Sequence, residues 1–121
     1  MAKRKDNSLK LEEIVIEGIL EKKGKNIISI DFSEQQNSIC KKFVICNGDS
    51  NTHVKAIANS VEELVKKKLK EIVWRKEGFE NSLWILLDYS DIVVHIFQTQ
   101  QREYYKLENL WADNVSRRIS E

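Results

Sequence analysis

Residues 83–98 have the sequence LWILLDYSDIVVHIFQ, and this stretch decides the fold class. Apolar residues, many of them β-branched or aromatic, fill 83–89 and 92–98, a composition typical of strands. Only the short turn Tyr89-Ser90-Asp91 links the two runs. A link of this length predicts two antiparallel strands that lie side by side.

Two earlier segments, 26–32 and 42–46, are also rich in β-branched and aromatic residues and are predicted strands, with a polar loop between them. Apolar residues then recur at helical spacing over 54–69, and Asp49 or Ser50 is available to cap this helix. The helix stands between strands on both sides, so it can be a crossover that joins parallel neighbours. The sheet is therefore expected to be mixed.

Three further segments complete the predicted fold. Apolar spacing predicts an amphipathic helix that is capped by Ser8 and ends near Gly24. Residues 73–77 are predicted to be extended, and a short helix is predicted from about 101 to 113. The expected fold class is α/β, with a mixed sheet of about five strands and helices mainly on one face.

The composition agrees with one compact domain. The 121 residues are 41% apolar and 32% charged and include no proline, which supplies enough apolar side chains for one core. We therefore expect a single domain over 1–121, with flexible ends at about 1–7 and 114–121. No apolar run approaches the roughly 20 residues that cross a bilayer, and no signal-type stretch follows the basic start, so a cytoplasmic protein without a membrane partner is expected. Cys40 and Cys46 are assigned no chemistry.

The net charge of +1 conceals an uneven distribution. Residues 78–121 carry four Lys or Arg against seven Asp or Glu, and they also hold several aromatic residues. An acidic, aromatic region favours a basic protein partner over a nucleic acid, which requires a basic binding surface. The lysines of the second predicted helix are interpreted as a solvated face; they are Lys66, Lys67, Lys68 and Lys70.

No residues with a catalytic spacing are found in the sequence. The turn at 46–50 has one glycine and lacks the glycine spacing and lysine of a phosphate loop, so it is interpreted as a helix cap. Asp88 and Asp91 flank a turn and are interpreted as acceptors for backbone amides rather than as metal ligands. His53 and His95 have no evident third ligand or nucleophile. We therefore expect no catalytic residue, no metal and no cofactor.

Period two in the last two predicted strands gathers Trp84, Asp88, His95 and Phe97 on one face of the sheet. This face is either an exposed binding patch or a surface buried under a helix or a partner subunit. The sequence leaves both interpretations open. With three side chains of the last predicted helix, the candidate partner-binding residues are Trp84, Asp88, His95, Tyr105, Glu108 and Trp111.

Five groups of residues follow one another in a distinctive order. They are Phe43-Val44-Ile45-Cys46 with Gly48, Ser50, His53 and Val54; Glu77-Gly78; Trp84-Ile85-Leu86-Leu87-Asp88; the run DIVVHIF at 91–97; and Arg102, Tyr105, Leu107-Glu108 and Leu110-Trp111. In this order, over about residues 9–113, the chain resembles the ribosomal silencing factor family, also called the Iojap-like family. The combination is far more specific than any single group.

The resemblance implies a fold related to nucleotidyltransferases and a role as a translational repressor rather than an enzyme. It implies binding to the fourteenth protein of the large ribosomal subunit, which blocks joining of the two subunits. It also implies a homodimer when the protein is free, and exposed apolar side chains such as Leu86 and Val93 would favour self-association. The acidity of residues 78–121 agrees with a basic ribosomal protein as the partner, and contact with ribosomal RNA is expected to be secondary.

The alternative hypothesis is a nucleotidyltransferase-type enzyme that acts on a small substrate or on RNA. Such an enzyme normally needs two or three carboxylates around metal ions. The segment after Gly48-Asp49-Ser50 has no Asp-x-Asp pair, which disfavours this alternative.

Overall fold

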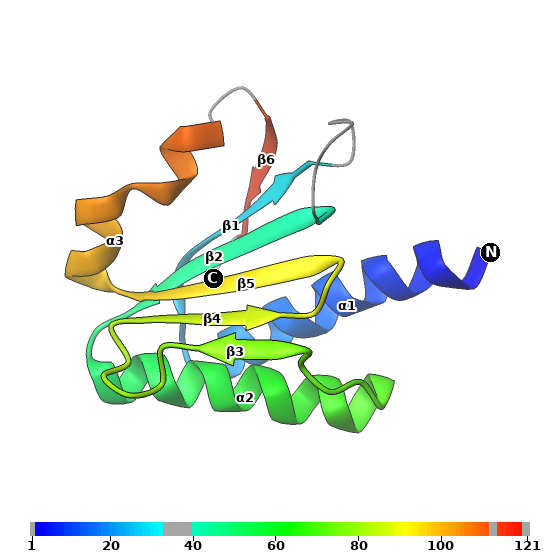
Figure 1. The fold of residues 1–121 in the computed structure, drawn as a ribbon, viewed down its shortest axis with the longest axis horizontal. Helices are drawn as coiled ribbons and strands as arrows, with labels where there is room; N and C mark the ends of the chain where they lie inside the picture. Colours follow the sequence, from blue (N-terminus) through cyan, green and yellow to red (C-terminus); the bar gives the residue numbers. More distant parts are fainter. Residues whose placement is uncertain (1, 33–39, 112–113, 120–121) are drawn as a thin grey trace.

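A mixed six-stranded sheet, with the strand order β3-β4-β5-β2-β1-β6, forms the middle of the molecule (Figure 1). The computed structural model describes residues 2–32, 40–111 and 114–119, with side chains from residue 9 onward. In chain order the elements are α1 (Ala2–Glu21), β1 (Lys25–Asp31), β2 (Lys42–Gly48), α2 (Asn51–Leu69), β3 (Arg75–Glu77), β4 (Trp84–Asp88), β5 (Ile92–Gln98), α3 (Thr99–Tyr105), the 3-10 helix η1 (Leu107–Trp111) and β6 (Val115–Arg118).

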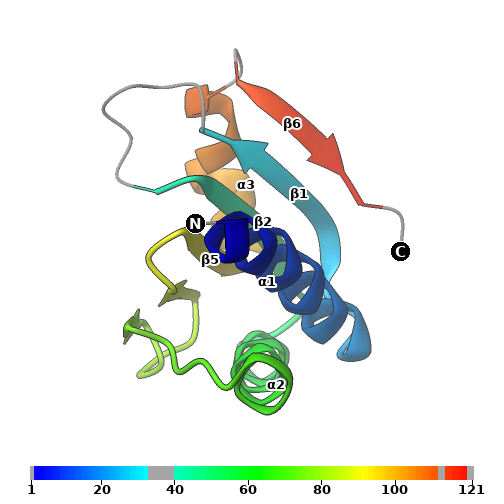
Figure 2. The same cartoon turned by 90° about the vertical axis from the view of Figure 1, so that its right-hand side faces the viewer.

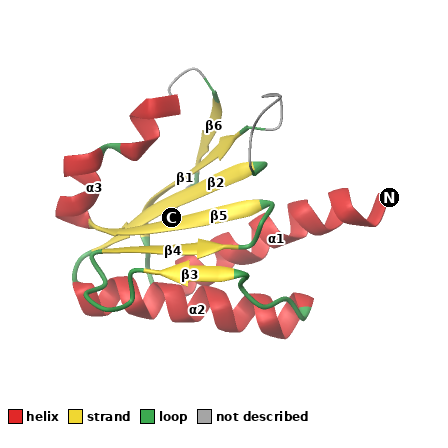
Figure 3. Ribbon diagram, viewed as in Figure 1, coloured by secondary structure: helices red, strands yellow, loops and turns green. Residues whose placement is uncertain are grey.

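The predicted α/β class and mixed sheet are confirmed. β2 and β5 are parallel, and every other neighbouring pair of strands is antiparallel. Parallel strands need a long connection, and α2 together with β3 and β4 supplies it (Figure 3). The β4–β5 hairpin forms as predicted, with Trp84 opposite Phe97 and Asp88 opposite Val93.

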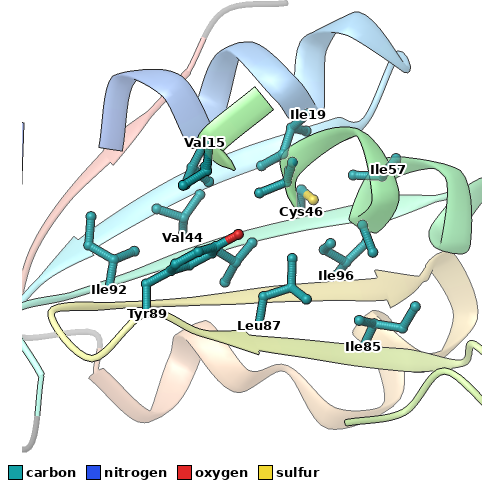
Figure 4. Close-up of a cluster of buried hydrophobic side chains, with 14 of the residues drawn as sticks. Val15, Ile19, Val44, Cys46, Ile57, Ile85, Leu87, Tyr89, Ile92 and Ile96 are labelled. Atoms are coloured by element: carbon teal, nitrogen blue, oxygen red, sulfur yellow. The ribbon is translucent and has the colours of Figure 1, made fainter. Parts of the chain in front are cut away.

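Helices α1 and α2 cover one face of the sheet, and α3 and η1 lie on the other (Figure 2). The larger core fills the space under α1 and α2, where Val15, Ile19 and Ile57 from the helices meet Val44 and Ile96 from the strands (Figure 4). All five side chains are fully buried. Their period of two on the strands and about 3.6 on the helices explains why the sequence predicted this core.

The start of α2 is fixed by a side-chain cap. The Oγ atom of Ser50 accepts a hydrogen bond from the backbone N–H of His53 at 3.1 Å. Asp49, the other predicted cap, instead pairs with the Lys25 ammonium at 3.0 Å. The choice that the sequence left open is therefore resolved in favour of Ser50.

Two predicted boundaries are wrong, and one strand was not predicted. Ser8 is not a cap, because α1 begins at Ala2 and runs through it. The single helix predicted at 101–113 is interrupted at Lys106, which adopts a left-handed conformation with φ 48° between α3 and η1. The strand β6 was not predicted, since it forms by pairing with the edge of β1.

Some expectations from the sequence stay predictions. The polar loop predicted at 33–38 lies outside the described residues, and so does Asp113. The relation to nucleotidyltransferases is likewise untested. No helix in the described ranges has both the length and the apolarity needed to cross a membrane.

A buried carboxylate ties α1 to three strands. Glu12 is 3% exposed and accepts hydrogen bonds from Ser29 Oγ on β1 at 2.6 Å and from Lys42 Nζ on β2 at 2.7 Å. The guanidinium of Arg117 on β6 lies 3.1 Å away. Burial alone would raise the pKa of Glu12, but hydrogen bonds from Lys42 and Ser29 and the positive charges of Lys42 and Arg117 hold that pKa below its ordinary value. The ionised carboxylate therefore fixes how α1 lies on the sheet.

The Glu12→Gln variant is expected to lower the free energy of unfolding at pH 7 by at least about 2 kcal/mol, because it leaves Lys42 without its counter-charge in a largely buried position. Arg117→Gln is the matched control, since its exposed pair should contribute less than about 1 kcal/mol. Urea unfolding followed by circular dichroism measures both values. Equal losses in the two variants would contradict the central position of Glu12.

The difference in the free energy of unfolding between the wild type and Glu12→Gln should depend on pH. A carboxyl whose pKa is lower in the folded state stabilises the fold above its unfolded pKa, and this stabilisation is lost as the pH falls through the folded pKa. The difference between the wild type and Glu12→Gln should therefore narrow below pH 4.5, the ordinary value for this group.

Candidate functional site

Aromatic rings cover the sheet face opposite α1 and α2. Together they form what we call the aromatic cluster: Phe32, Phe43, Trp84, His95, Phe97, Tyr105 and Trp111. The Trp84 ring stacks on Phe97 with centroids 4.6 Å apart and meets Tyr105 at 5.1 Å. The cluster therefore joins strands β4 and β5 to helix α3.

The second half of the cluster lies over β2. The Phe43 ring lies 4.4 Å from the His95 ring and 5.1 Å from the Trp111 ring. Trp111 also meets Phe32, with centroids 5.3 Å apart. Because Trp111 is the last residue of η1, these contacts hold the 3-10 helix against the sheet.

His95 is the polar centre of the cluster. It is 4% exposed, and its Nδ1 atom accepts a hydrogen bond from the indole Nε1–H of Trp84 at 3.2 Å. Burial lowers the pKa of His95 to about 4, so the ring is neutral at physiological pH. With Nδ1 as the acceptor, the proton lies on Nε2, which is buried and has no hydrogen-bond partner among the described residues. The arrangement orients the Trp84 indole and places no positive charge on this face.

The face is only partly open. Val93 and Phe97 are buried, because η1 and the neighbouring strands pack over them, whereas Trp84 and Trp111 are half-buried. Tyr105 is 50% exposed. Both interpretations left open by the sequence therefore apply to different residues: burial to His95 and Phe97, and access to the rings at the margin. Because Val93 is buried within the chain, it cannot favour self-association as the sequence suggested.

Asp88 does not belong to the aromatic cluster. It lies at the far end of β4 from Trp84, and its Oδ1 accepts the backbone N–H of Ser90 at 2.7 Å. The backbone carbonyl of Asp91 accepts the N–H groups of Lys41 and Lys42. The contact of Asp88 agrees with its interpretation as an acceptor for a turn amide, whereas the contact of Asp91 is made by its backbone and leaves the role of its side chain a prediction. Within the ranges 2–32, 40–111 and 114–119, no three His, Cys, Asp or Glu side chains gather to form a metal site.

Glu108 is engaged within the chain. Its Oε2 lies 3.3 Å from Nε of Arg102, which is 6% exposed. The same guanidinium donates to Asn47 Oδ1 at 2.9 Å and to the backbone carbonyl of Asn26. Glu108 is therefore largely neutralised and serves to hold η1 to the ends of β1 and β2, so it is a poor candidate for pairing with a partner's cation.

Sequence reasoning missed two features of this region. The first is the structural role of Arg102, which only its buried contacts reveal. The second is the exposure of Tyr104 and Leu110, at 79% and 71%, beside the half-exposed Tyr105. An amphipathic count could have flagged them, because a single helix over 101–113 cannot bury all of its apolar side chains.

Comparison with known proteins identifies a family. A model described as "Ribosomal silencing factor during starvation" matches residues 5–121. A protein of Chromobacterium violaceum named "Ribosomal silencing factor RsfS" is 39% identical over 102 residues, which cover 84% of this chain and 82% of that protein. A protein of the same name from Halalkalibacterium halodurans is 34% identical over 103 residues, covering 85% and 86%.

A solved structure gives the same fold. The crystal structure of a Chromobacterium violaceum protein superimposes with a TM-score of 0.80 at 36% identity, covering 86% of this chain and 85% of that one. At this TM-score and identity, the two chains share one fold.

The buried His95 predicts a pH-dependent stability. The folded state resists protonation down to about pH 4, whereas the unfolded chain takes up the proton near pH 6.5. The free energy of unfolding should therefore fall as the pH drops from 6.5 to 4, with roughly 3 kcal/mol from His95. In His95→Asn, the amide oxygen can still accept the Trp84 indole N–H but does not titrate, so this part of the slope should disappear.

Urea unfolding at a series of pH values measures the slope for each variant. His53→Asn is the matched control, because it changes the other histidine and leaves the Trp84–His95 bond in place. Identical slopes in the wild type and His95→Asn would show that His95 is not the group responsible.

Proposed function

The chain belongs to the ribosomal silencing factor family, and on that premise we propose that it represses translation by binding the fourteenth protein of the large ribosomal subunit. The bound protein would sterically block the small subunit from joining. The observation that carries this proposal is the aromatic cluster, in which Trp84 is oriented by a hydrogen bond and still partly exposed. This repression would take place in the cytoplasm, where the ribosomal subunits join.

The margin of the aromatic cluster suits a protein interface. Tryptophan and tyrosine side chains that are rigid before binding lose little conformational entropy on docking and supply large desolvated area. Trp84, Tyr105 and Trp111 meet this description, because each ring is held by at least one neighbouring ring. The three are proposed as the partner-binding residues, with His95 as a positioning residue behind them.

Electrostatic steering is the second support for this proposal. Residues 78–121 carry a net charge of −3, and ribosomal proteins are generally basic. Because Glu108 is paired with Arg102 and Asp88 accepts from a turn amide, exposed acids such as Glu103 are better placed to act on an approaching partner. The names of the related proteins denote a regulatory role, and a steric mechanism needs no chemical step.

A homodimer of the free protein is also proposed. Tyr104, Leu110 and Val115 are each more than two-thirds exposed and lie within one short segment that runs from α3 to β6. Apolar side chains of this size gain free energy when a second copy covers them. A dimer through this segment would lie next to the aromatic cluster, so that dimerisation and ribosome binding would compete.

Trp84→Ala or Trp111→Ala is expected to weaken binding to the isolated fourteenth large-subunit protein by at least about 2 kcal/mol, or about 30-fold. Trp74→Ala is the matched control, because Trp74 is exposed on a distant part of the chain and should leave this affinity unchanged. Calorimetry with each purified variant, after circular dichroism has shown that it is folded, measures the affinity. Equal losses for Trp74 and Trp84 would overturn the choice of binding face.

Self-association should give about twice the chain mass of 14.2 kDa in sedimentation equilibrium at micromolar concentration. Leu110→Glu should give the monomer mass, because a buried unpaired charge opposes the contact. Ile72→Glu, an equally exposed side chain on another surface, should still dimerise. A monomeric wild type, or a dimer that tolerates Leu110→Glu, would contradict the proposed contact.

A further inference from the structure

An exposed tryptophan lies at the opposite end of the molecule from α3. Ile72 and Trp74 stand in the connection from α2 to β3, where they are 75% and 69% exposed. The Arg75 guanidinium lies over the Trp74 ring, 4.9 Å from its centroid. Figure 1 shows this connection at the end of the sheet where α1 begins, away from α3 and η1. Trp84 stands at the other end of β4 from Asp88, the residue that pairs with Arg75.

Several cations lie close to the exposed tryptophan in the sequence, at the end of α2 and the start of β3. Lys68 pairs with Glu17 and Lys76 pairs with Glu62, each at 3.1 Å. Within the described part of the chain, four other cations here make no ion pair: Lys66, Lys67, Lys70 and Arg75. Glu63 and Glu71 line the same pocket as Lys66, and Glu77 follows Arg75 by two residues in β3.

The start of α1 lies at the same end of the molecule. Figure 2, which faces it, shows the start of α1 above the end of α2. In the sequence, residues 2–10 hold four Lys or Arg against one Asp, and the side chain of Lys10 is exposed. Two segments that are far apart in the sequence therefore lie at one end of the molecule.

The fold requires neither an exposed tryptophan at position 74 nor the unpaired cations near it in the sequence. Lysines in the last turn of α2 stabilise the helix end through its dipole, which explains their charge but not an exposed tryptophan beside them. Trp74 contributes its backbone N–H to the Asp88 carbonyl, and any residue except proline could do the same. The Arg75 guanidinium lies over one side of the ring, and the rest of this exposed ring is left available for a ligand.

We propose that this end, which we call the basic tryptophan end (Lys66, Lys67, Lys70, Ile72, Trp74 and Arg75), binds single-stranded RNA. An exposed aromatic ring among cations is the arrangement that such RNA recognises, with a base stacked on the ring and phosphates near the lysines. The further claim that this RNA belongs to the ribosome rests on the proposed function. The stacking platform and the cations stand on the geometry alone.

A second, weaker contact at this end would strengthen docking. The aromatic cluster and the basic tryptophan end are on separate parts of one rigid sheet, so binding at one raises the effective concentration of the other site's ligand. An anionic bilayer is the other surface that attracts tryptophan and lysine. Two exposed apolar side chains offer it little area for insertion, which favours RNA.

The direct test measures binding of the full purified chain to a fluorescently labelled single-stranded oligoribonucleotide across a salt series. Trp74→Ala should weaken binding at least about fivefold, because stacking on one aromatic ring is worth about 1–3 kcal/mol per base. The double variant Lys67→Gln with Lys70→Gln should reduce the slope of log affinity against log salt by about 0.7 for each phosphate that these lysines neutralise. Quenching of tryptophan fluorescence in the wild type, absent in Trp74→Ala, would report stacking itself.

Matched controls separate this site from its surroundings. Lys55→Gln removes an exposed lysine from the other end of the same helix and should leave the affinity and salt slope unchanged. Trp84→Ala should retain wild-type RNA affinity, in contrast to its expected loss of binding to the fourteenth protein. Absence of RNA binding, or binding that is insensitive to Trp74 and to the lysines, would overturn the proposal.

The outcomes also separate this inference from the proposed function. If RNA binding fails while Trp84-dependent binding to the isolated ribosomal protein persists, only the inference is overturned. If RNA binding depends on Trp74 while the ribosomal protein does not bind, the inference stands and the proposed partner is wrong. Binding of Trp74 to vesicles of phosphatidylglycerol and phosphatidylcholine, without binding to RNA, would assign the end to a membrane and overturn the inference.

Discussion

Parallel pairing of β2 with β5 forces the chain to return to the same end of the sheet before β5 can begin, and α2 with the β3–β4 pair makes that return. The helix must lie on one face, where α1 packs beside it with Gly18 against Val61; a Cβ on Gly18 would lie 3.0 Å from the Val61 Cα atom. The opposite face is then left to the short helical segments after β5. This asymmetry gives the molecule one helix-covered face and one aromatic face.

The same pair of strands positions both parts of the candidate site. His95 stands opposite Ile45 in the β2–β5 register, and Asn47 stands opposite Phe97 two residues further along. His95 orients Trp84, and Asn47 accepts from Arg102, which in turn holds Glu108 and η1. The indole on β4 and the rings on α3 and η1 are thus held by the same pair of strands. Short helical segments can therefore present aromatic rings that lose little conformational entropy on docking.

The elements that depend on neighbouring residues alone were predicted from the sequence. The β4–β5 hairpin and α2 with its Ser50 cap follow from period two, period 3.6 and one side-chain hydrogen bond, all of which are visible in neighbouring residues. The strand β6 and the break at Lys106 depend on pairing with β1 and on packing over the far face, which no short window contains. Within the site, the sequence placed Trp84, Tyr105 and Trp111 in one patch, but the pairing of Glu108 with the buried Arg102 could not be seen in a charge count.

The uneven charge of the sequence acquires a spatial meaning in the fold. The acidic third of the chain supplies the margin of the aromatic cluster, whereas the lysine-rich end of α2 lies at the other end of the sheet. A partner built from both basic protein and RNA offers both signs of charge, so each end would be attracted to a different component and the molecule would dock in one orientation. Salt weakens an RNA contact more steeply than an aromatic protein contact. As ionic strength rises, the RNA contact that orients the molecule would therefore be lost before the affinity for the ribosomal protein is lost. Separate sites of moderate strength also permit release, which a reversible block of the ribosome requires.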